Sequence, residues 1–79
     1  MTVRAKFYCN AETHKKWGAQ ADKVVRSYEF QAMYDSETPE DQRYAKATPV
    51  GSLTIQVDNP AVTFEPGKSY YLDFTPVEA

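Results

Sequence analysis

The residue types that most often carry out chemistry in proteins are scarce in this chain. It has one cysteine, Cys9, and one histidine, His14. His14 lies in a polar stretch where nothing nearby in sequence would tune it as a general base, so we expect a solvated surface residue. Cys9 falls on the predicted inward face of a strand, which favours a buried structural thiol over a nucleophile. A single cysteine excludes an internal disulfide, and one cysteine with one histidine cannot form a Cys/His zinc cluster within one chain.

The acidic residues do not form a recognisable site. Four carboxylates cluster at Asp35, Glu37, Glu40 and Asp41. They lack the glycine and the alternating ligand spacing of a calcium loop, and a solvated loop that leads into a helix accounts for them. The glycines are isolated turn residues rather than a phosphate-binding loop. These patterns predict a protein that is not an enzyme, with no catalytic residue, no cofactor and no metal.

A basic cluster is the first candidate for binding. It comprises Lys15, Lys16, Trp17, Lys23 and Arg26. Cations beside a large ring are typical of proteins that bind single-stranded nucleic acids, where cations contact phosphates and rings stack on bases. Against this stands a sequence pI of about 5.2, far from the basic value expected of such domains. An OB-like single-stranded nucleic-acid-binding module is therefore an alternative interpretation.

A stripe of large side chains is the second candidate. It comprises Tyr8, Val25, Met33 and Tyr71 on the predicted outer faces of the strands, with Asp73 beside it. Exposed tyrosine and methionine on a small sheet often mark a protein interface. The alternative is that a barrel wall or a helix covers these side chains. We take Tyr71 and Asp73, together with the basic cluster, as the candidate partner-binding residues.

The charge of the chain is unevenly distributed along its length. Residues 1–26 carry six basic and two acidic side chains, for a net +4, and residues 27–79 carry three basic and nine acidic ones, for a net −6. Such asymmetry can create a bipolar surface that attracts a charged partner or a second copy. Strands from both halves that alternate in space would instead average the field out.

The elements that must position these residues are mostly strands. Alternation of apolar and polar residues predicts a strand from residue 3 to 9, with the inward series continuing through Ala11 and Thr13 toward Trp17. Turn residues at 18–22 then predict a hairpin with a second strand at about 24–34. Thr38 as N-cap and Pro39 as first helical residue predict a short helix through residue 46. Further strands are expected at 52–57, 62–64 and 70–74. The last follows a type II turn at 65–68 and directs Tyr70, Leu72 and Phe74 inward.

These elements predict a single β-rich domain over residues 1–79. The expected fold is all-β: a small antiparallel barrel or sandwich of four to five strands, with one short helix near 39–46. No run approaches the roughly 18 apolar residues of a membrane span, and the N-terminus lacks the apolar block of a signal peptide. We therefore expect a cytoplasmic protein without a membrane partner.

Four stretches carry a family likeness: the run Ala47–Leu53, the turn Asp58–Pro60, the run Phe64–Pro76 and the start Val3–Cys9. They resemble small uncharacterised accessory proteins of tailed bacteriophages, with the strongest match over residues 47–76 and a looser one over residues 1–34. The resemblance implies a phage protein without enzyme activity, in the bacterial host cytoplasm or in the virion. It brings no known binding residues with it.

Taken together, the residues and the resemblance predict a binding protein that acts by protein–protein contact. The first hypothesis is a host-takeover or anti-defence inhibitor of a bacterial protein. The second is a virion structural component such as a capsid decoration protein, and the third is the nucleic-acid module. Edge strands of a small sheet can also pair with a second copy, so self-association is a further expectation.

Overall fold

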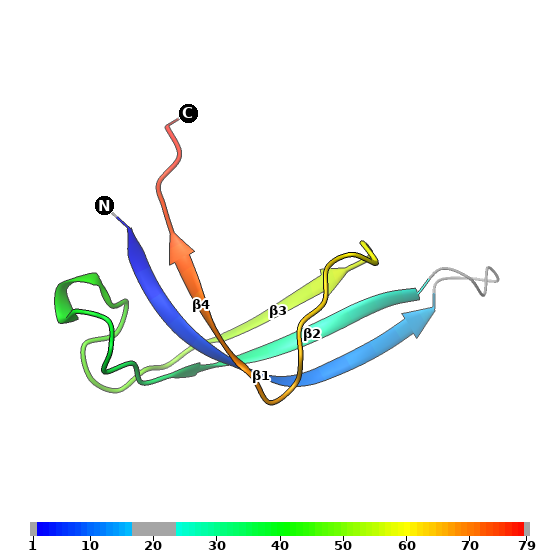
Figure 1. Ribbon diagram of the computed structural model, residues 1–79, viewed down its shortest axis with the longest axis horizontal. Helices are drawn as coiled ribbons and strands as arrows, with labels where there is room; N and C mark the ends of the chain where they lie inside the picture. The colour runs from blue at the N-terminus through cyan, green and yellow to red at the C-terminus, as the bar shows by residue number, and fades with distance from the viewer. Residues whose placement is uncertain (1, 17–23, 79) are drawn as a thin grey trace.

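The computed structural model describes residues 2–16 and 24–78, which contain four β-strands. The strands are β1 (Val3–Lys16), β2 (Val24–Met33), β3 (Ser52–Val57) and β4 (Ser69–Phe74). All neighbours are antiparallel, and the order across the sheet is β3-β2-β1-β4 (Figure 1). The predicted all-β antiparallel class is confirmed. The strands form one open sheet, however, and neither close into a barrel nor stack as a sandwich.

Two of the expected elements are absent from the part of the chain that the structure describes. The helix expected near 39–46 is a single 3₁₀ turn, η1 (Glu40–Gln42). Thr38 does not cap it, because its hydroxyl donates a hydrogen bond to the Asp35 carboxylate instead. Residues 62–64 are loop rather than strand, and Phe64 packs its ring onto the sheet from that loop. Thr38 thus bonds to a loop residue and Phe64 packs on the sheet, in place of the regular elements expected.

A β-bulge in β1 changes which residues face the core. Cys9 pairs with Phe30, but the next residue of β2 pairs with Ala11, so Asn10 is the extra residue. Beyond it Glu12 shares a face with Tyr28, and Ala11 and Thr13 lie on the opposite face. The expectation that Ala11 and Thr13 continue the inward series is therefore wrong, because one inserted residue reverses the alternation.

One face of the sheet carries the core, and we call it the inner face. Its buried apolar side chains are Ala5, Phe7, Cys9, Tyr28, Phe30 and Val57. Phe64 covers the middle of this face from the β3–β4 loop, with its ring edge-to-face on Phe30 and Tyr70 at centroid distances of 5.3 and 5.4 Å. These geometries are the favoured ones for aromatic pairs. Loops, rather than a second layer of secondary structure, therefore cover the core.

Turns and a long loop hold the ends of the strands. Gly67 has φ of +97°, and Lys68 N–H donates to the Glu65 carbonyl at 3.1 Å, which confirms the turn expected before β4. The loop of residues 34–51 returns along β1, where Tyr44 N–H donates to the Arg4 carbonyl at 3.2 Å. The Tyr44 ring stacks on Phe7 with 6.2 Å between centroids. This loop thus covers the part of the inner face around Phe7.

The molecule is thin and elongated for its length. Its principal extents are 49 × 34 × 19 Å and its radius of gyration is 15.2 Å, whereas a compact domain of this length has about 12 Å. Its accessible surface is 5976 Å², about 1,100 Å² more than is usual for a folded chain of this mass. No helix in the described ranges is long and apolar enough to cross a membrane. The chain therefore leaves more surface exposed than a compact domain of its mass.

Candidate functional site

The predicted basic cluster is divided between the two faces of the β1–β2 hairpin. Lys15 is exposed and lies opposite Val25, on the outer face. Arg26 lies opposite His14 on the inner face. Trp17 and Lys23 fall outside the described residues. The described parts of the cluster thus do not form one surface, because adjacent positions along a strand point to opposite faces.

Arg26 is engaged in contacts within the chain. Its guanidinium donates to the Tyr28 hydroxyl at 3.0 Å and to the Asn59 carbonyl at 2.7 Å. The Tyr28 hydroxyl in turn donates to Glu12 Oε1 at 2.8 Å. Arg26 therefore ties the β3–β4 loop to the sheet, so its donors are used for structure rather than for a partner's phosphate.

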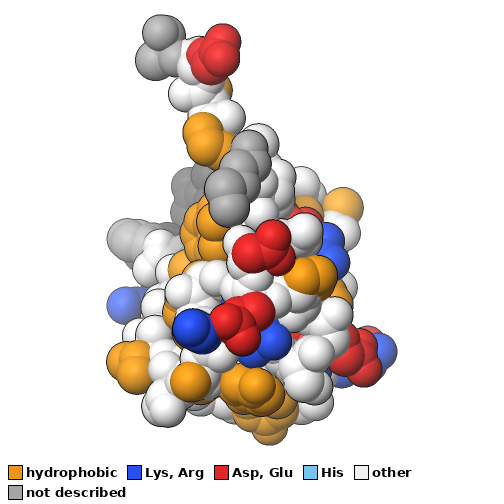
Figure 2. All heavy atoms as spheres, turned by 90° about the vertical axis from the view of Figure 1, so that its left-hand side faces the viewer, with side chains coloured by type: hydrophobic (Ala, Val, Ile, Leu, Met, Phe, Trp, Pro, Cys, Tyr) orange, Lys and Arg blue, Asp and Glu red, His pale blue; other side chains and the backbone are white. Residues whose placement is uncertain are grey.

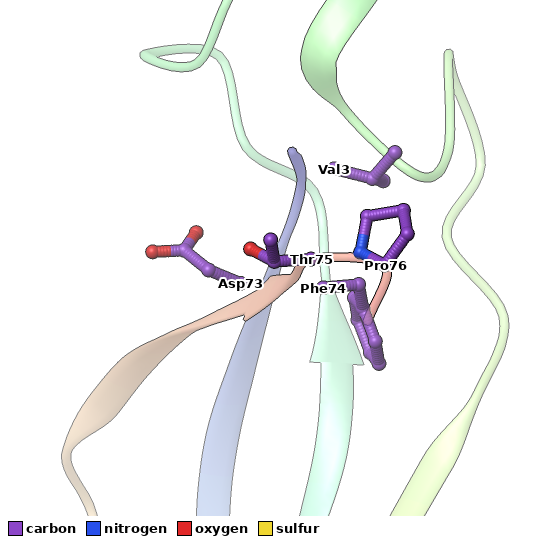
Figure 3. A pocket seen from close by; sticks show the side chains of 5 residues that line it. All are labelled: Val3, Asp73, Phe74, Thr75 and Pro76. Atoms are coloured by element: carbon purple, nitrogen blue, oxygen red, sulfur yellow. The ribbon is translucent and has the colours of Figure 1, made fainter. Parts of the chain in front are cut away.

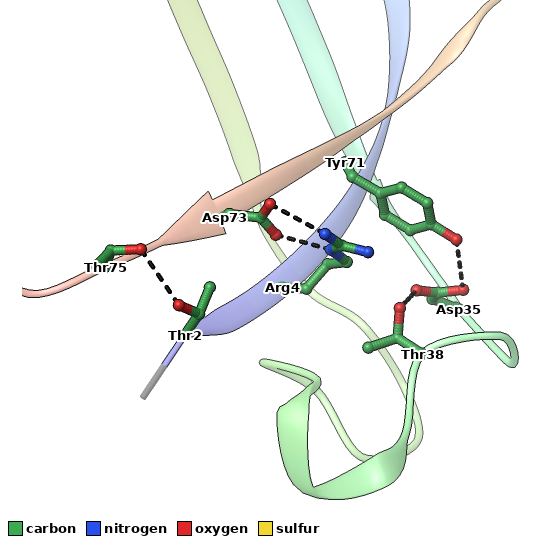
Figure 4. A network of polar contacts seen from close by, with 7 residues as sticks. All are labelled: Thr2, Arg4, Asp35, Thr38, Tyr71, Asp73 and Thr75. Carbon is green, nitrogen blue, oxygen red and sulfur yellow. Dashed lines mark hydrogen bonds and ion pairs between the residues drawn. The ribbon is translucent and has the colours of Figure 1, made fainter.

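Tyr71 and Asp73 lie on the outer face, as predicted, and Arg4 binds both (Figure 4). The Arg4 guanidinium donates to the two carboxylate oxygens of Asp73 at 2.7 and 3.1 Å. Its carbon lies 4.7 Å from the centre of the Tyr71 ring. The hydrogen bond with Arg4 lowers the pKa of Asp73 and raises that of Arg4. Asp73 thus already has its counter-ion, although both side chains are accessible.

Asp35, a residue of the 34–51 loop, joins this network through Tyr71. It is buried, accepts hydrogen bonds from the Thr38 hydroxyl and the Glu37 amide, and receives the Tyr71 hydroxyl at 3.4 Å. Chiefly the Thr38 hydrogen bond holds the pKa of Asp35 below its ordinary value. A buried carboxylate with these partners serves to fasten the loop to the outer face.

The predicted outer stripe is not a continuous apolar surface. Tyr8 and Tyr71 are 38% and 45% exposed, while Val25 and Met33 are half-buried. Lys6 pairs with both Met33 and Tyr71, so a cation stands in the middle of the stripe. At one end of the molecule, Figure 2 shows acidic and basic side chains interspersed with hydrophobic ones. The outer face is therefore polar with isolated rings rather than an apolar patch.

An open apolar region lies at the end of the inner face where the N-terminal end of β1 meets the C-terminal end of β4. Val3 pairs with Phe74, and together with Pro76 they line a shallow hollow whose rim includes Asp73 and Thr75 (Figure 3). Phe74 is 54% exposed. The alternation in β4 correctly places Phe74 on the same face as Tyr70 and Leu72. It does not reveal that the Phe74 side chain stays largely exposed in the folded chain.

The described residues offer little for catalysis. No three His, Cys, Asp or Glu side chains among them lie close enough to hold a metal ion. His14 is exposed and lies 3.5 Å from Glu12. Cys9 is buried, as expected, and burial raises its pKa, so the reactive thiolate is disfavoured.

Comparison with known proteins assigns no family to this chain. Comparisons with protein-family models, with curated proteins and with solved structures each returned no match. The functional argument therefore depends on the geometry of this chain.

Proposed function

We propose that this protein is a non-enzymatic binding module that contacts another protein through the open end of its inner face. The observation that supports this most directly is the exposed apolar surface formed by Val3, Phe74 and Pro76. Large apolar side chains that remain exposed beside a polar rim are typical of protein interfaces. An apolar side chain of a partner that fills this hollow would remove Phe74 from water.

The resemblance to tailed-phage accessory proteins supports a specific version of this proposal. The partner would be a bacterial protein that the phage inhibits, in the host cytoplasm. Binding would then need no chemistry from Cys9 or His14. A role in the virion, such as capsid decoration, would use the same surface on a different partner.

The nucleic-acid alternative is less favoured by the geometry. Arg26 binds Tyr28 and Asn59, and Lys15 lies on the other face of the hairpin. A groove that follows a phosphate backbone needs its cations along one surface. Strong binding of single-stranded DNA that weakens steeply with salt, and is lost in Lys15→Glu, would revive that alternative.

A capture experiment with two matched variants tests the proposal. Phe74 and Tyr34 are both 54% exposed, and only Phe74 lines the hollow. Tagged wild-type chain should capture a defined bacterial protein, and the purified pair should bind in isothermal titration calorimetry. Phe74→Ser should weaken that binding at least tenfold and Tyr34→Ser should leave it within about twofold, because buried aromatic anchors dominate interfaces. Equal affinities for the two variants would refute the role of the hollow.

A further inference from the structure

The two edges of the sheet differ in how well they are protected against pairing. The β4 edge carries the charged residue Asp73 within the strand. Prolines flank both edge strands at similar distances, Pro66 and Pro76 around β4 and Pro49 and Pro60 around β3. The β3 edge, Ser52–Val57, has no charged residue, no proline and no glycine. Natural sheets usually protect an exposed edge with such residues, since a bare edge pairs with other strands. The six residues of the β3 edge lack such a residue within the strand itself, and Asp58 follows them directly.

The backbone of β3 is oriented so that alternate residues face the open side. Gly51 directs its carbonyl toward β2, where it accepts the Ala32 amide at 3.0 Å. Because backbone groups alternate along a strand, Leu53, Ile55 and Val57 also direct theirs toward β2. The amides and carbonyls of Ser52, Thr54 and Gln56 then point to the free side. All three side chains are exposed and uncharged.

We infer that β3 is the dimerisation strand of this protein and pairs antiparallel with β3 of a second copy. A two-fold axis at Thr54 places Ser52 opposite Gln56 of the second copy, with the free amides and carbonyls facing one another. On the inner face, the half-buried Leu53 lies opposite Ile55 of the second copy. No like charges meet anywhere along this pairing, so the strand is complementary to itself.

The chain has enough excess surface area for an interface of ordinary size. The chain exposes about 1,100 Å² more than is usual for its mass, and a stable interface buries about 800 Å² on each partner. Pairing at β3 extends the inner face across both copies into one eight-stranded sheet. The β3 edge is separate from the hollow at Phe74. Phe74 is at the end of β4, and β2 and β1 lie between β3 and β4 in the sheet. The dimer thus goes beyond the proposed partner binding and does not depend on it.

Sedimentation equilibrium of the full chain tests the dimer. The wild type should have twice the 9.0 kDa chain mass. Thr54→Pro should be monomeric, because proline removes an amide on the free side while leaving the β2 side intact. Ser69→Pro makes the matching change in the β4 edge strand and should remain dimeric. A monomeric wild type, or a Thr54→Pro variant that still dimerises, would overturn the inference.

A second variant and a second measurement guard against misfolding. Thr54→Lys places a charge on the edge without constraining the backbone, and it should also be monomeric, with the circular dichroism spectrum of the wild type. Hydrogen exchange should show the Thr54 amide protected in the concentrated wild type and exposed on dilution. An amide that is unprotected at all concentrations would contradict pairing at this strand. Phe74→Ser should remain dimeric, so failure of the partner proposal and failure of the dimer are distinguishable.

Discussion

At the scale of single residues, Phe64 packs against the core although it lies in a loop. It comes from a loop, yet its ring contacts Tyr28, Phe30 and Tyr70 and covers the middle of the inner face. The sheet supplies the floor of the core, and Phe64 is the chief side chain packed on it from above. A polar loop with one aromatic residue is enough to keep water from this part of the sheet.

Truncation of Phe64 should therefore be costly. We expect Phe64→Ala to lower the free energy of unfolding by about 3 kcal/mol, the low end for large-to-small aromatic changes, because Phe64 is only half-buried. Phe74→Ala should cost less than about 1 kcal/mol, since Phe74 is mostly exposed. Urea denaturation followed by tyrosine and tryptophan fluorescence measures both. Similar losses in the two variants would mean that Phe64 does not cover the core.

Asp35 should make the stability of the 34–51 loop depend on acid. Its pKa in the folded chain is lowered, chiefly by the Thr38 hydroxyl. A group with a lowered folded pKa stabilises the fold above its unfolded value, near 4, and that contribution is lost as pH falls through the folded value. Wild-type melting temperature should thus fall as pH drops below about 4. Asp73 has the same direction of shift, with Arg4 as the main cause.

The comparison of two amide variants separates these carboxylates. Asp35→Asn should melt at a lower temperature at pH 7 and show a shallower decline below pH 4, because the titrating group is gone. Asp73→Asn should change the melting temperature less at pH 7, since its bridge to Arg4 is solvent-exposed. An acid transition in Asp35→Asn as steep as in the wild type would assign the acid sensitivity to other carboxylates.

At the scale of elements, the bulge at Asn10 determines which side chains of β1 lie on the inner face beyond Cys9. It places Glu12 beneath the Tyr28 hydroxyl, where a strand with regular alternation would place Ala11 or Thr13. The β1–β2 hairpin thereby changes along its length from an apolar inner face to a polar one. This change lies where the Lys68 carbonyl and the Gly67 amide bond to the backbone of Cys9, at the start of β4.

Deletion variants test this account of the bulge. Removal of Asn10 should leave every pairing beyond it in place and shift the melting temperature by only a few degrees, because the extra residue has no partner. Removal of Tyr8, two residues away in a regular part of the strand, should unfold the chain, since it turns part of the inner series outward. Thermal melts followed by far-ultraviolet circular dichroism report both. Equal tolerance of the two deletions would argue against a fixed register.

The sequence predicts the strands of this protein better than the arrangement of its layers. Alternation locates all four strands, because a half-buried strand must alternate. It misses the bulge, since Asn10 has no feature that separates it from any polar strand residue. It also assigns Phe64 to a strand, because an aromatic residue that packs from a loop carries the same local pattern.

The candidate site is harder to predict from sequence for a related reason. Alternation puts Tyr71 and Asp73 on the outer face correctly, but their engagement by Arg4 depends on β1 and β4 being neighbours. The exposure of Phe74 depends on where loops that are distant in sequence lie in the folded chain. Neither property is local, so neither leaves a signal in the spacing of residues.

At the scale of the whole molecule, the chain buries little for its length. Among the residues that the structure describes, six apolar side chains form the buried core, in a sheet one layer thick. A chain of this size has a marginal stability of about 4 to 12 kcal/mol even when compact. Association would therefore contribute a large share of the total stability.

The melting temperature should consequently depend on protein concentration. For a folded dimer that separates into unfolded chains, we expect a rise of about 4 °C for each tenfold increase in concentration. Differential scanning calorimetry over two decades of concentration measures this. Thr54→Pro should melt at a lower temperature that does not change with concentration. A wild-type melting temperature that is independent of concentration would mean that the monomer is the stable unit.

The burial of Cys9 makes the rate of thiol labelling a measure of how often the inner face opens. Its side chain has no accessible surface, and it is the one thiol in the chain. A thiol reagent can therefore react only with molecules whose inner face is exposed at that moment, so each modified chain records a single opening event. In the limit of excess reagent, the rate of labelling becomes the rate at which the sheet loses its cover. The loops over the core, and not the strands beneath them, would then set the lifetime of the closed state.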